Sequence, residues 1–251
     1  MTRLKLLGAA VLLSTTAFAG ASHAAVLYDN GPAVGGTGVS LLTPPASTYG
    51  FGDQTASGNA VAENFTVSGS SWNVSSLDFY SYQTGAVGFT FQTATWSIVS
   101  GADVNTGSVV ASGTTAVTNG GLVGYRALNT TPNDQTRAVY RVSADISDFV
   151  LGTGNYFLTW SLTGTAASGP WVPPVDGPLG GNALQSTTFG PYVTLVEAGS
   201  GLGVELPFTI NGTTAAAAVP EAQTWAMMIV GFGVIGGALR QRRGKTTVNF
   251  A

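Results

Sequence analysis

The feature that most constrains this chain is a two-residue alternation of apolar and polar side chains. It is clearest in "NYFLTWSLTG", where every second position from Tyr156 to Leu162 is apolar and Thr159 and Ser161 are polar. Successive side chains of a strand point to opposite faces of a sheet, so this pattern predicts a half-buried β-strand. The same alternation occurs in residues 95–98 and 204–210.

Further strand candidates recur along the chain at short intervals. They cover residues 26–28, 61–67, 72–82, 108–112, 122–128, 137–144 and 192–197. Turn sequences rich in Gly, Ser, Thr and Asn separate them, without a convincing amphipathic helix between them. We therefore expect residues 25–210 to form an all-β ectodomain, an antiparallel β-sandwich of jelly-roll-like type. Because Pro207 cannot donate a ladder hydrogen bond, we expect the strand at 204–210 to lie at a sheet edge.

Two segments rich in Gly, Thr and Pro, residues 30–58 and 164–182, break this rhythm and are expected to form long loops. Long ordered loops are where binding sites concentrate on β domains. The second loop contains Trp171 within "SGPWVPP". An aromatic ring held by flanking prolines can stack on a sugar ring, so Trp171 is a candidate carbohydrate contact. The alternative is that Trp171 caps one end of the sandwich.

Three other tryptophans, Trp72, Trp96 and Trp160, fall within strand patterns and are expected in the core.

The N-terminus has the pattern of a secretory signal peptide, residues 1–24. Arg3 and Lys5 precede an apolar run, and the small-residue stretch "GASHAA" follows it. Cleavage is expected between Ala24 and Ala25, with cuts after Ala19 or Ala21 as alternatives. An uncleaved anchor fits less well, because the apolar run is shorter than the roughly 20 residues that a bilayer requires.

Composition excludes several kinds of chemistry from the mature chain. The sequence has no cysteine, and its one histidine, His23, lies in the expected signal peptide. Zinc sites, cysteine nucleophiles and Ser-His-Asp triads are therefore excluded, as are disulfides. All acidic residues except Glu221 lie in residues 25–219, eleven acids against three arginines. This acidic balance argues against nucleic-acid binding.

The C-terminal tail begins after a short linker of small residues, 211–219. An uncharged apolar run at 224–239 is followed at once by a basic cluster. The run is slightly shorter than the usual span of about 20 residues, and it predicts a transmembrane helix. The basic cluster places residues 246–251 on the cytoplasmic side and the β domain outside.

The tail, residues 220–245, resembles the PEP-CTERM sorting tail in its PEPxxWA form. The matching positions are Pro220, Glu221, Trp225 and Ala226, followed by the basic residues Arg240, Arg242 and Arg243. Ala222 stands where that family has its second proline. The same tail is also labelled an ice-binding protein C-terminal domain, but the ectodomain shows no repeated Thr-x-Thr ladder beyond Thr93 and Thr95.

The resemblance implies a definite route. The protein would be exported across the inner membrane of a Gram-negative bacterium, held there for a time by its tail, and processed by an exosortase near the Pro-Glu pair. It would then reach the envelope surface or the extracellular matrix, where it would be associated with exopolysaccharide or biofilm. A stably retained single-span protein with a chance Pro-Glu pair is the alternative.

Three sets of residues are candidates for other chemistry. Glycoside hydrolysis can run on paired carboxylates alone, and the pairs available are Asp145 with Asp148 or Glu197 with Glu205. Asp103 and Asn105 in "DVNTG" resemble the start of a calcium loop, although the later bidentate Glu is missing and a plain turn explains them. We therefore expect a non-enzymatic surface or matrix protein without a cofactor, with a carbohydrate-binding module as the alternative and a hydrolase as a weaker one.

Overall fold

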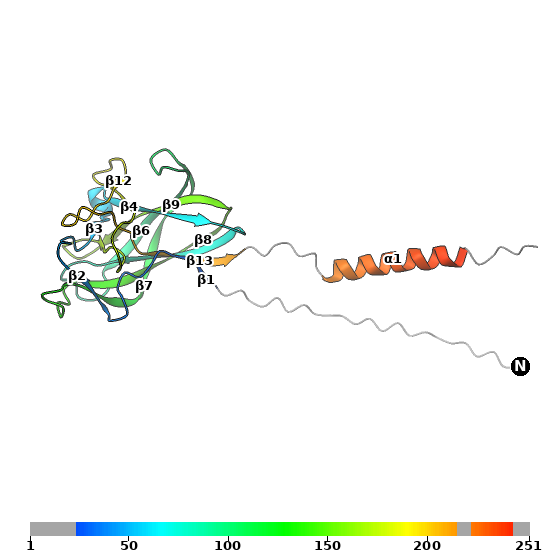
Figure 1. Ribbon diagram of the computed structural model, residues 1–251, viewed down its shortest axis with the longest axis horizontal. Helices are drawn as coiled ribbons and strands as arrows, with labels where there is room; N and C mark the ends of the chain where they lie inside the picture. The colour runs from blue at the N-terminus through cyan, green and yellow to red at the C-terminus, as the bar shows by residue number, and fades with distance from the viewer. Residues whose placement is uncertain (1–23, 215–221, 243–251) are drawn as a thin grey trace, which may run out of the picture.

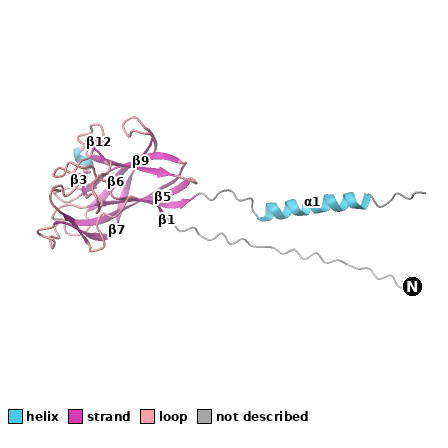
Figure 2. Cartoon of the chain, in the orientation of Figure 1, coloured by secondary structure: helices cyan, strands magenta, loops and turns pink. Residues whose placement is uncertain are grey.

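The computed structural model describes residues 24–214 and 222–242; up to the C-terminal helix the regular structure is β-strand apart from one short 3₁₀ helix, with loops between the strands (Figures 1 and 2). The strands are β1 (Ala25–Asp29), β2 (Val39–Leu42), β3 (Phe51–Gly52), β4 (Ala60–Val67), β5 (Trp72–Ser81), β6 (Phe91–Ser100), β7 (Ser108–Leu128), β8 (Ala138–Leu151), β9 (Gly154–Gly164), β10 (Trp171–Val172), β11 (Leu184–Ser186), β12 (Val193–Thr194) and β13 (Phe208–Thr214). A short 3₁₀ helix, η1 (Thr55–Ser57), follows β3. The predicted all-β, antiparallel class is confirmed.

The strands form one curled sheet in the order β1-β13-β5-β8-β7-β6-β9-β4-β11-β12, and β2 is added in parallel beside β7. Strand β7 belongs to both halves of this sheet. Its residues 108–116 pair with β6, and its residues 117–125 pair with β8. The predicted sandwich implied two separate sheets, whereas the structure joins both layers through this one long strand.

Glycines allow β7 to form bulges in the half that pairs with β8. Its pairing with β8 is interrupted by two register shifts, one between Asn119 and Gly121 and one between Leu122 and Gly124. Gly121 and Gly124 have φ angles of 113° and 148°, a region that residues with a Cβ rarely adopt. Bulges of this kind increase the local bend and twist of a strand.

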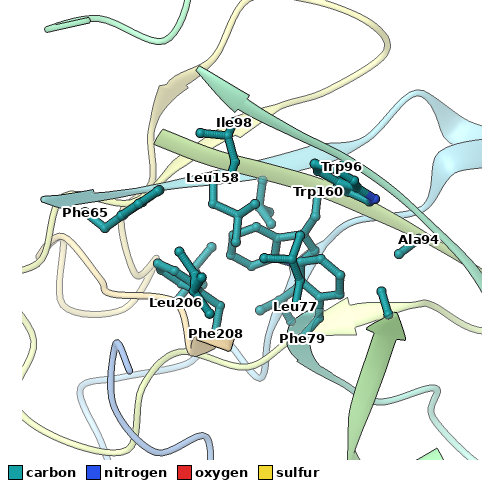
Figure 3. Packing of buried hydrophobic residues seen from close by; sticks show 14 of the residues in the cluster. Phe65, Leu77, Phe79, Ala94, Trp96, Ile98, Leu158, Trp160, Leu206 and Phe208 are labelled. Carbon is teal, nitrogen blue, oxygen red and sulfur yellow. The ribbon is translucent and has the colours of Figure 1, made fainter. Parts of the chain in front are cut away.

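The core lies between the two halves of the curled sheet and is rich in aromatic rings (Figure 3). Trp160 from β9 stacks on Phe79 from β5, with ring centroids 5.5 Å apart, and lies 5.9 Å from Phe208 of β13. Phe208 also lies 6.2 Å from Phe65 of β4. These contacts cross from one half of the sheet to the other. Trp72 and Trp96 are also buried, as their strand patterns predicted.

The prediction of an edge position for the last strand is wrong. Strand β13 lies between β1 and β5 and pairs with both. Pro207 stands immediately before the first residue of the strand, Phe208, so its missing N–H leaves the ladder intact.

The two segments that were expected to be long loops lie side by side. Each contains a two-residue strand, and these strands, β3 and β10, pair with each other as a small separate sheet. Trp171 pairs with Gly52, and Val172 pairs with Phe51. Segments more than a hundred residues apart in the sequence are thereby joined at one end of the domain.

The tail contains a helix, α1 (Ala222–Arg242), which includes the predicted helical run 224–239. Its apolar side chains are exposed, for example Met227 and Ile229 at 74% and 70%. None of the helices in the described residues combines the length and hydropathy that a membrane crossing requires. Residues 1–23 of the predicted signal peptide and the residues Pro220, Glu221 and Arg243 lie outside the described residues.

We predict that Phe208→Ala lowers the free energy of unfolding by about 3–5 kcal/mol, because it removes a buried ring that joins the two halves of the sheet. Val87→Ala is the control, since the side chain of Val87 is 97% exposed and its loss removes little buried area. Urea denaturation followed by tryptophan fluorescence measures both. Similar midpoints for the two variants would contradict the assignment of Phe208 to the core.

Candidate functional site

The pairing of β3 with β10 creates an aromatic pocket of about 300 Å³ at one end of the domain. Its lining residues are Tyr49, Gly50, Tyr82, Thr84, Arg137, Ser168 and Trp171, and we call this set the aromatic pocket. The first two come from the loop before β3 and the last two from the loop that contains β10. Both predicted loops therefore contribute to the same pocket.

The backbone of Trp171 is fixed by hydrogen bonds to Tyr82 and Ser81. Its N–H donates to the carbonyl of Tyr82 (2.9 Å), and its carbonyl accepts from the N–H of Tyr82 (3.0 Å) and from the hydroxyl of Ser81 (2.9 Å). The indole Nε1–H donates to the Ser168 hydroxyl at 3.2 Å. The ring is half-buried, so one part packs on the domain while the rest remains accessible.

Arg137 covers the ring of Tyr49. Its guanidinium carbon lies 3.6 Å from the ring centroid, a cation–π contact, and its Nη1 donates to Asp134 Oδ2 at 2.9 Å. Hydrogen bonds from the side chain and backbone of Thr136, together with Arg137, lower the pKa of Asp134. Asp134 is therefore ionised at neutral pH and holds the guanidinium in place.

Tyr82 forms the inner wall of the pocket. The side chain is 2% exposed, and burial raises the pKa of its phenol above the usual value, so the hydroxyl stays protonated at neutral pH. A Cβ added at Gly50 would lie only 2.8 Å from this hydroxyl. Glycine at position 50 is therefore needed for the close approach of its backbone to Tyr82.

This arrangement suits a small ligand with both apolar and hydroxylated surfaces. Trp171 offers an aromatic face, and one face of Tyr49 is covered by Arg137. The guanidinium of Arg137 and the hydroxyls of Thr84 and Tyr82 offer hydrogen-bonding groups. Binding sites for small molecules commonly combine aromatic walls with a few such polar groups. Sequence reasoning found Trp171 but missed Tyr49, Tyr82 and Arg137, because their neighbourhood depends on the β3–β10 pairing.

A second pocket of about 270 Å³ lies beside the aromatic pocket, with Arg126, Asp176 and Glu197 among its lining residues. Arg126 is buried and donates to the Ser40 hydroxyl (2.6 Å) and to the carbonyls of Tyr49 (3.2 Å) and Thr48 (3.4 Å). These bonds connect Arg126, on β7, to β2 and to the segment between β2 and β3. The guanidinium of Arg126 therefore positions the backbone of Tyr49.

Glu197 also holds the segment between β2 and β3, because it accepts hydrogen bonds from the backbone N–H groups of Ser47 and Thr48. Burial alone would raise the pKa of Glu197, but backbone N–H donors from Ser47, Ser200 and Thr48 lower it to about 2. Its oxygens are occupied by these bonds. Glu197 is thus a structural carboxylate that stays ionised, a poor candidate for a general acid.

The structure pairs two acids that the sequence had not paired. Glu63 is fully buried on β4, accepts from the N–H of Leu206 at 2.9 Å, and is close enough to Glu205 for that carboxylate to oppose its ionisation. Burial is the larger cause, and together these effects raise the pKa of Glu63 to about 9. Glu205 in turn accepts from Asn30 (3.4 Å) and from the N–H of Asn182 (3.3 Å).

A third buried acid, Asp53, directly follows β3. It is 0% exposed, and within the described residues neither of its carboxylate oxygens has a hydrogen-bond partner. Burial raises the pKa of Asp53 well above its usual value. Burial therefore favours the neutral form of this carboxyl group.

The acid pairs predicted from the sequence do not form a common site. Asp145 and Asp148 are both exposed on β8, and Asp148 accepts from Asn73 at 3.4 Å. Glu197 and Glu205 have the separate partners described above. The carboxylate of Asp103 accepts from the backbone N–H of Asn105 at 2.8 Å, the bond expected of a turn. Among the described residues no group of three or more potential metal ligands is found.

The other predicted site residues lie at the ends of the described chain. Ala24 precedes β1, and Ala25 is its first residue. Trp225, Ala226, Arg240 and Arg242 belong to α1, with Ala226 and Arg240 exposed.

No protein-family model and no curated protein matches the chain. The function is therefore argued from the geometry of the pocket and from the order of features along the sequence.

We predict that Glu63→Gln changes how stability depends on pH. The folded state raises the pKa of this carboxyl from 4.5 to about 9, so its contribution to stability is fully present below pH 4.5 and is lost as the pH rises towards 9. The variant cannot ionise, so its free energy of unfolding should not fall over this range, whereas that of the wild type should fall by several kcal/mol, since one pKa unit corresponds to about 1.4 kcal/mol.

Urea denaturation across this pH range measures the difference. The control is Asp145→Asn, which removes an exposed carboxylate and should leave the slope with pH unchanged. An unchanged slope in Glu63→Gln would show that Glu63 does not titrate in the way its burial implies.

Proposed function

We propose that residues 25–210 are a non-enzymatic, saccharide-binding domain of an exported surface or matrix protein, which is retained on exopolysaccharide. The observation that carries this proposal is the aromatic pocket, in which Trp171, Tyr49 and Arg137 converge from three separate parts of the chain. Its volume of about 300 Å³ is at the lower end of the range for ligand sites, which suits one or two sugar rings.

The chemistry of a sugar ring matches these residues. The C–H face of a pyranose is apolar and packs on an indole or phenol ring, while its hydroxyl groups bond to polar side chains around the rim. The Trp171 indole is fixed by its hydrogen bond to Ser168, so little side-chain freedom would be lost on binding. Pre-organisation of this kind favours ligand contact over a purely capping role for Trp171.

A carboxylate-based glycoside hydrolase is supported less well. Such enzymes place two carboxyl groups about 5–9 Å apart around the bond that is cut. The aromatic pocket has no Asp or Glu among its lining residues. The neighbouring pocket contains Asp176 and Glu197, but Glu197 is held ionised by backbone N–H groups and Asp176 accepts from Ser40 at 2.8 Å.

We predict that Trp171→Ala reduces retention of the protein on exopolysaccharide from the producing cells by about tenfold, a typical effect of losing one aromatic anchor. A pull-down with the purified polysaccharide measures retention, and circular dichroism checks that the variant is folded. Trp171→Phe is the matched control, because it keeps an aromatic face and should retain most of the binding. Equal retention of all three proteins would exclude the pocket as the binding site.

The second part of the proposal concerns the tail. We infer that residues 220–245 are a sorting signal which holds the chain at the inner membrane through residues 224–239 until an exosortase cuts near Pro220 and Glu221. The inference rests on the order of the motif, the apolar run and the basic cluster.

We predict that the intact mass of the protein recovered from the envelope or the medium corresponds to a chain ending between residues 219 and 221. Double substitution of Pro220 and Glu221 by Ala should restore a full-length C-terminus, because it removes the recognition pair. If both proteins keep residues 225–251, the tail is a stable attachment and no sorting signal. This result would leave the proposal for the aromatic pocket untouched.

A further inference from the structure

The distribution of charge around the aromatic pocket differs from that of the domain as a whole. Residues 25–219 carry eleven acidic residues and three arginines. Two of these arginines are next to Tyr49: Arg137 covers its ring at 3.6 Å, and Arg126 donates to its carbonyl at 3.2 Å. Two of the three arginines of the domain therefore lie at this one place, where Arg137 pairs with Asp134 and where Asp176 and Glu197 attract Arg126.

Both positive charges act inside the pocket. Burial is the main cause that raises the pKa of Tyr82; the charges of Arg137 and Arg126 oppose that rise, and weaker interactions with Asp53 and Tyr49 add to it. Asp53 is fully buried and does not line the pocket, and burial raises its pKa well above the usual value. Asp134 is the one carboxylate that forms an ion pair with Arg137 in the described residues, and it does not line the pocket.

The ion pair with Asp134 uses only part of the hydrogen-bonding capacity of the Arg137 guanidinium. A guanidinium carries five N–H donors in a planar fork, and the ion pair with Asp134 involves Nη1 alone. A guanidinium can bind a carboxylate through two parallel hydrogen bonds, a geometry that a neutral hydroxyl group cannot use as fully. The same side chain already stacks on Tyr49, next to the aromatic surface on which a sugar ring would lie.

We propose that the aromatic pocket selects an acidic saccharide, a uronate unit whose ring packs on Trp171 and whose carboxylate binds Arg137. This inference rests on the proposed saccharide-binding function and adds the chemical class of the ligand. Arg137 makes the direct contact. Arg126 is buried behind Tyr49 and does not touch the ligand. Its charge attracts the ligand carboxylate from a distance.

The test is isothermal titration calorimetry of the full-length chain with oligogalacturonate and with a neutral maltooligosaccharide of the same length. We expect the acidic oligosaccharide to bind roughly tenfold or more tightly, the effect of one charge-assisted hydrogen bond. The preference should shrink at high salt, because Arg137 is partly exposed and is screened by ions. Equal affinity for both oligosaccharides, or no binding of oligogalacturonate, would overturn the inference.

Variants separate the charge of Arg137 from the rest of the pocket. Arg137→Gln should remove the preference for the acidic ligand, and Arg137→Lys should restore part of it because the charge returns without the fork. Arg141→Gln is the control: it removes the same charge from a side chain that donates to the carbonyl of Gly120, away from the pocket. A preference that persists in Arg137→Gln would also overturn the inference.

Asp134 provides a variant with the opposite expected effect. Asp134→Asn removes the competing carboxylate while the amide oxygen can still accept from Arg137, so affinity for oligogalacturonate should rise several-fold. A decrease would contradict a direct contact between Arg137 and the ligand. The proposed saccharide-binding function fails separately, when Trp171→Ala leaves retention on the native polysaccharide unchanged.

Discussion

The structure depends on strand β7 being shared by both halves of the sheet. Its first half completes the layer of β6, β9 and β4, and its second half completes the layer of β8, β5 and β13. Once one strand is committed to both layers, their apolar faces are brought opposite each other, and aromatic rings such as Trp160 and Phe79 meet between them. Within the half that pairs with β8, Gly121 and Gly124 adopt positive φ angles beside the bulges.

The aromatic pocket forms where the small β3–β10 sheet is attached to the main sheet. Its two strands have only two residues each, too few to be stable alone, so neighbouring contacts must support them. The Tyr82–Trp171 bridge connects β10 to the end of β5, and Arg126 holds Tyr49 from within the domain. The pocket is thus built from loop residues whose backbones are fixed by the main sheet, which is the arrangement that binding sites on β domains commonly use.

Much of the fold follows from local sequence pattern, because burial on one face imposes a period of two. That pattern could also have found Glu63, which occupies an inward-facing position of β4 together with Val61, Phe65 and Val67. The position of β13 was mistaken because Pro207 was counted as part of the strand, while the ladder begins one residue later. The aromatic pocket could not be predicted in full, since Tyr49 and Trp171 are brought together by a pairing of two-residue strands that leave no periodic signal.

The positive charge of the pocket comes from Arg137, which lines it, with a further contribution from Arg126, which is buried nearby. A buried charge needs hydrogen-bond partners, and those of Arg126 are a hydroxyl and two backbone carbonyls. Such partners stabilise the guanidinium without cancelling its charge, whereas Arg137 has a direct ion pair with Asp134. Asp176 and Glu197 attract Arg126 from the side of the second pocket. The charge of Arg126 also acts on Tyr82. A ligand carboxylate beside Arg137 would therefore be attracted by both arginines.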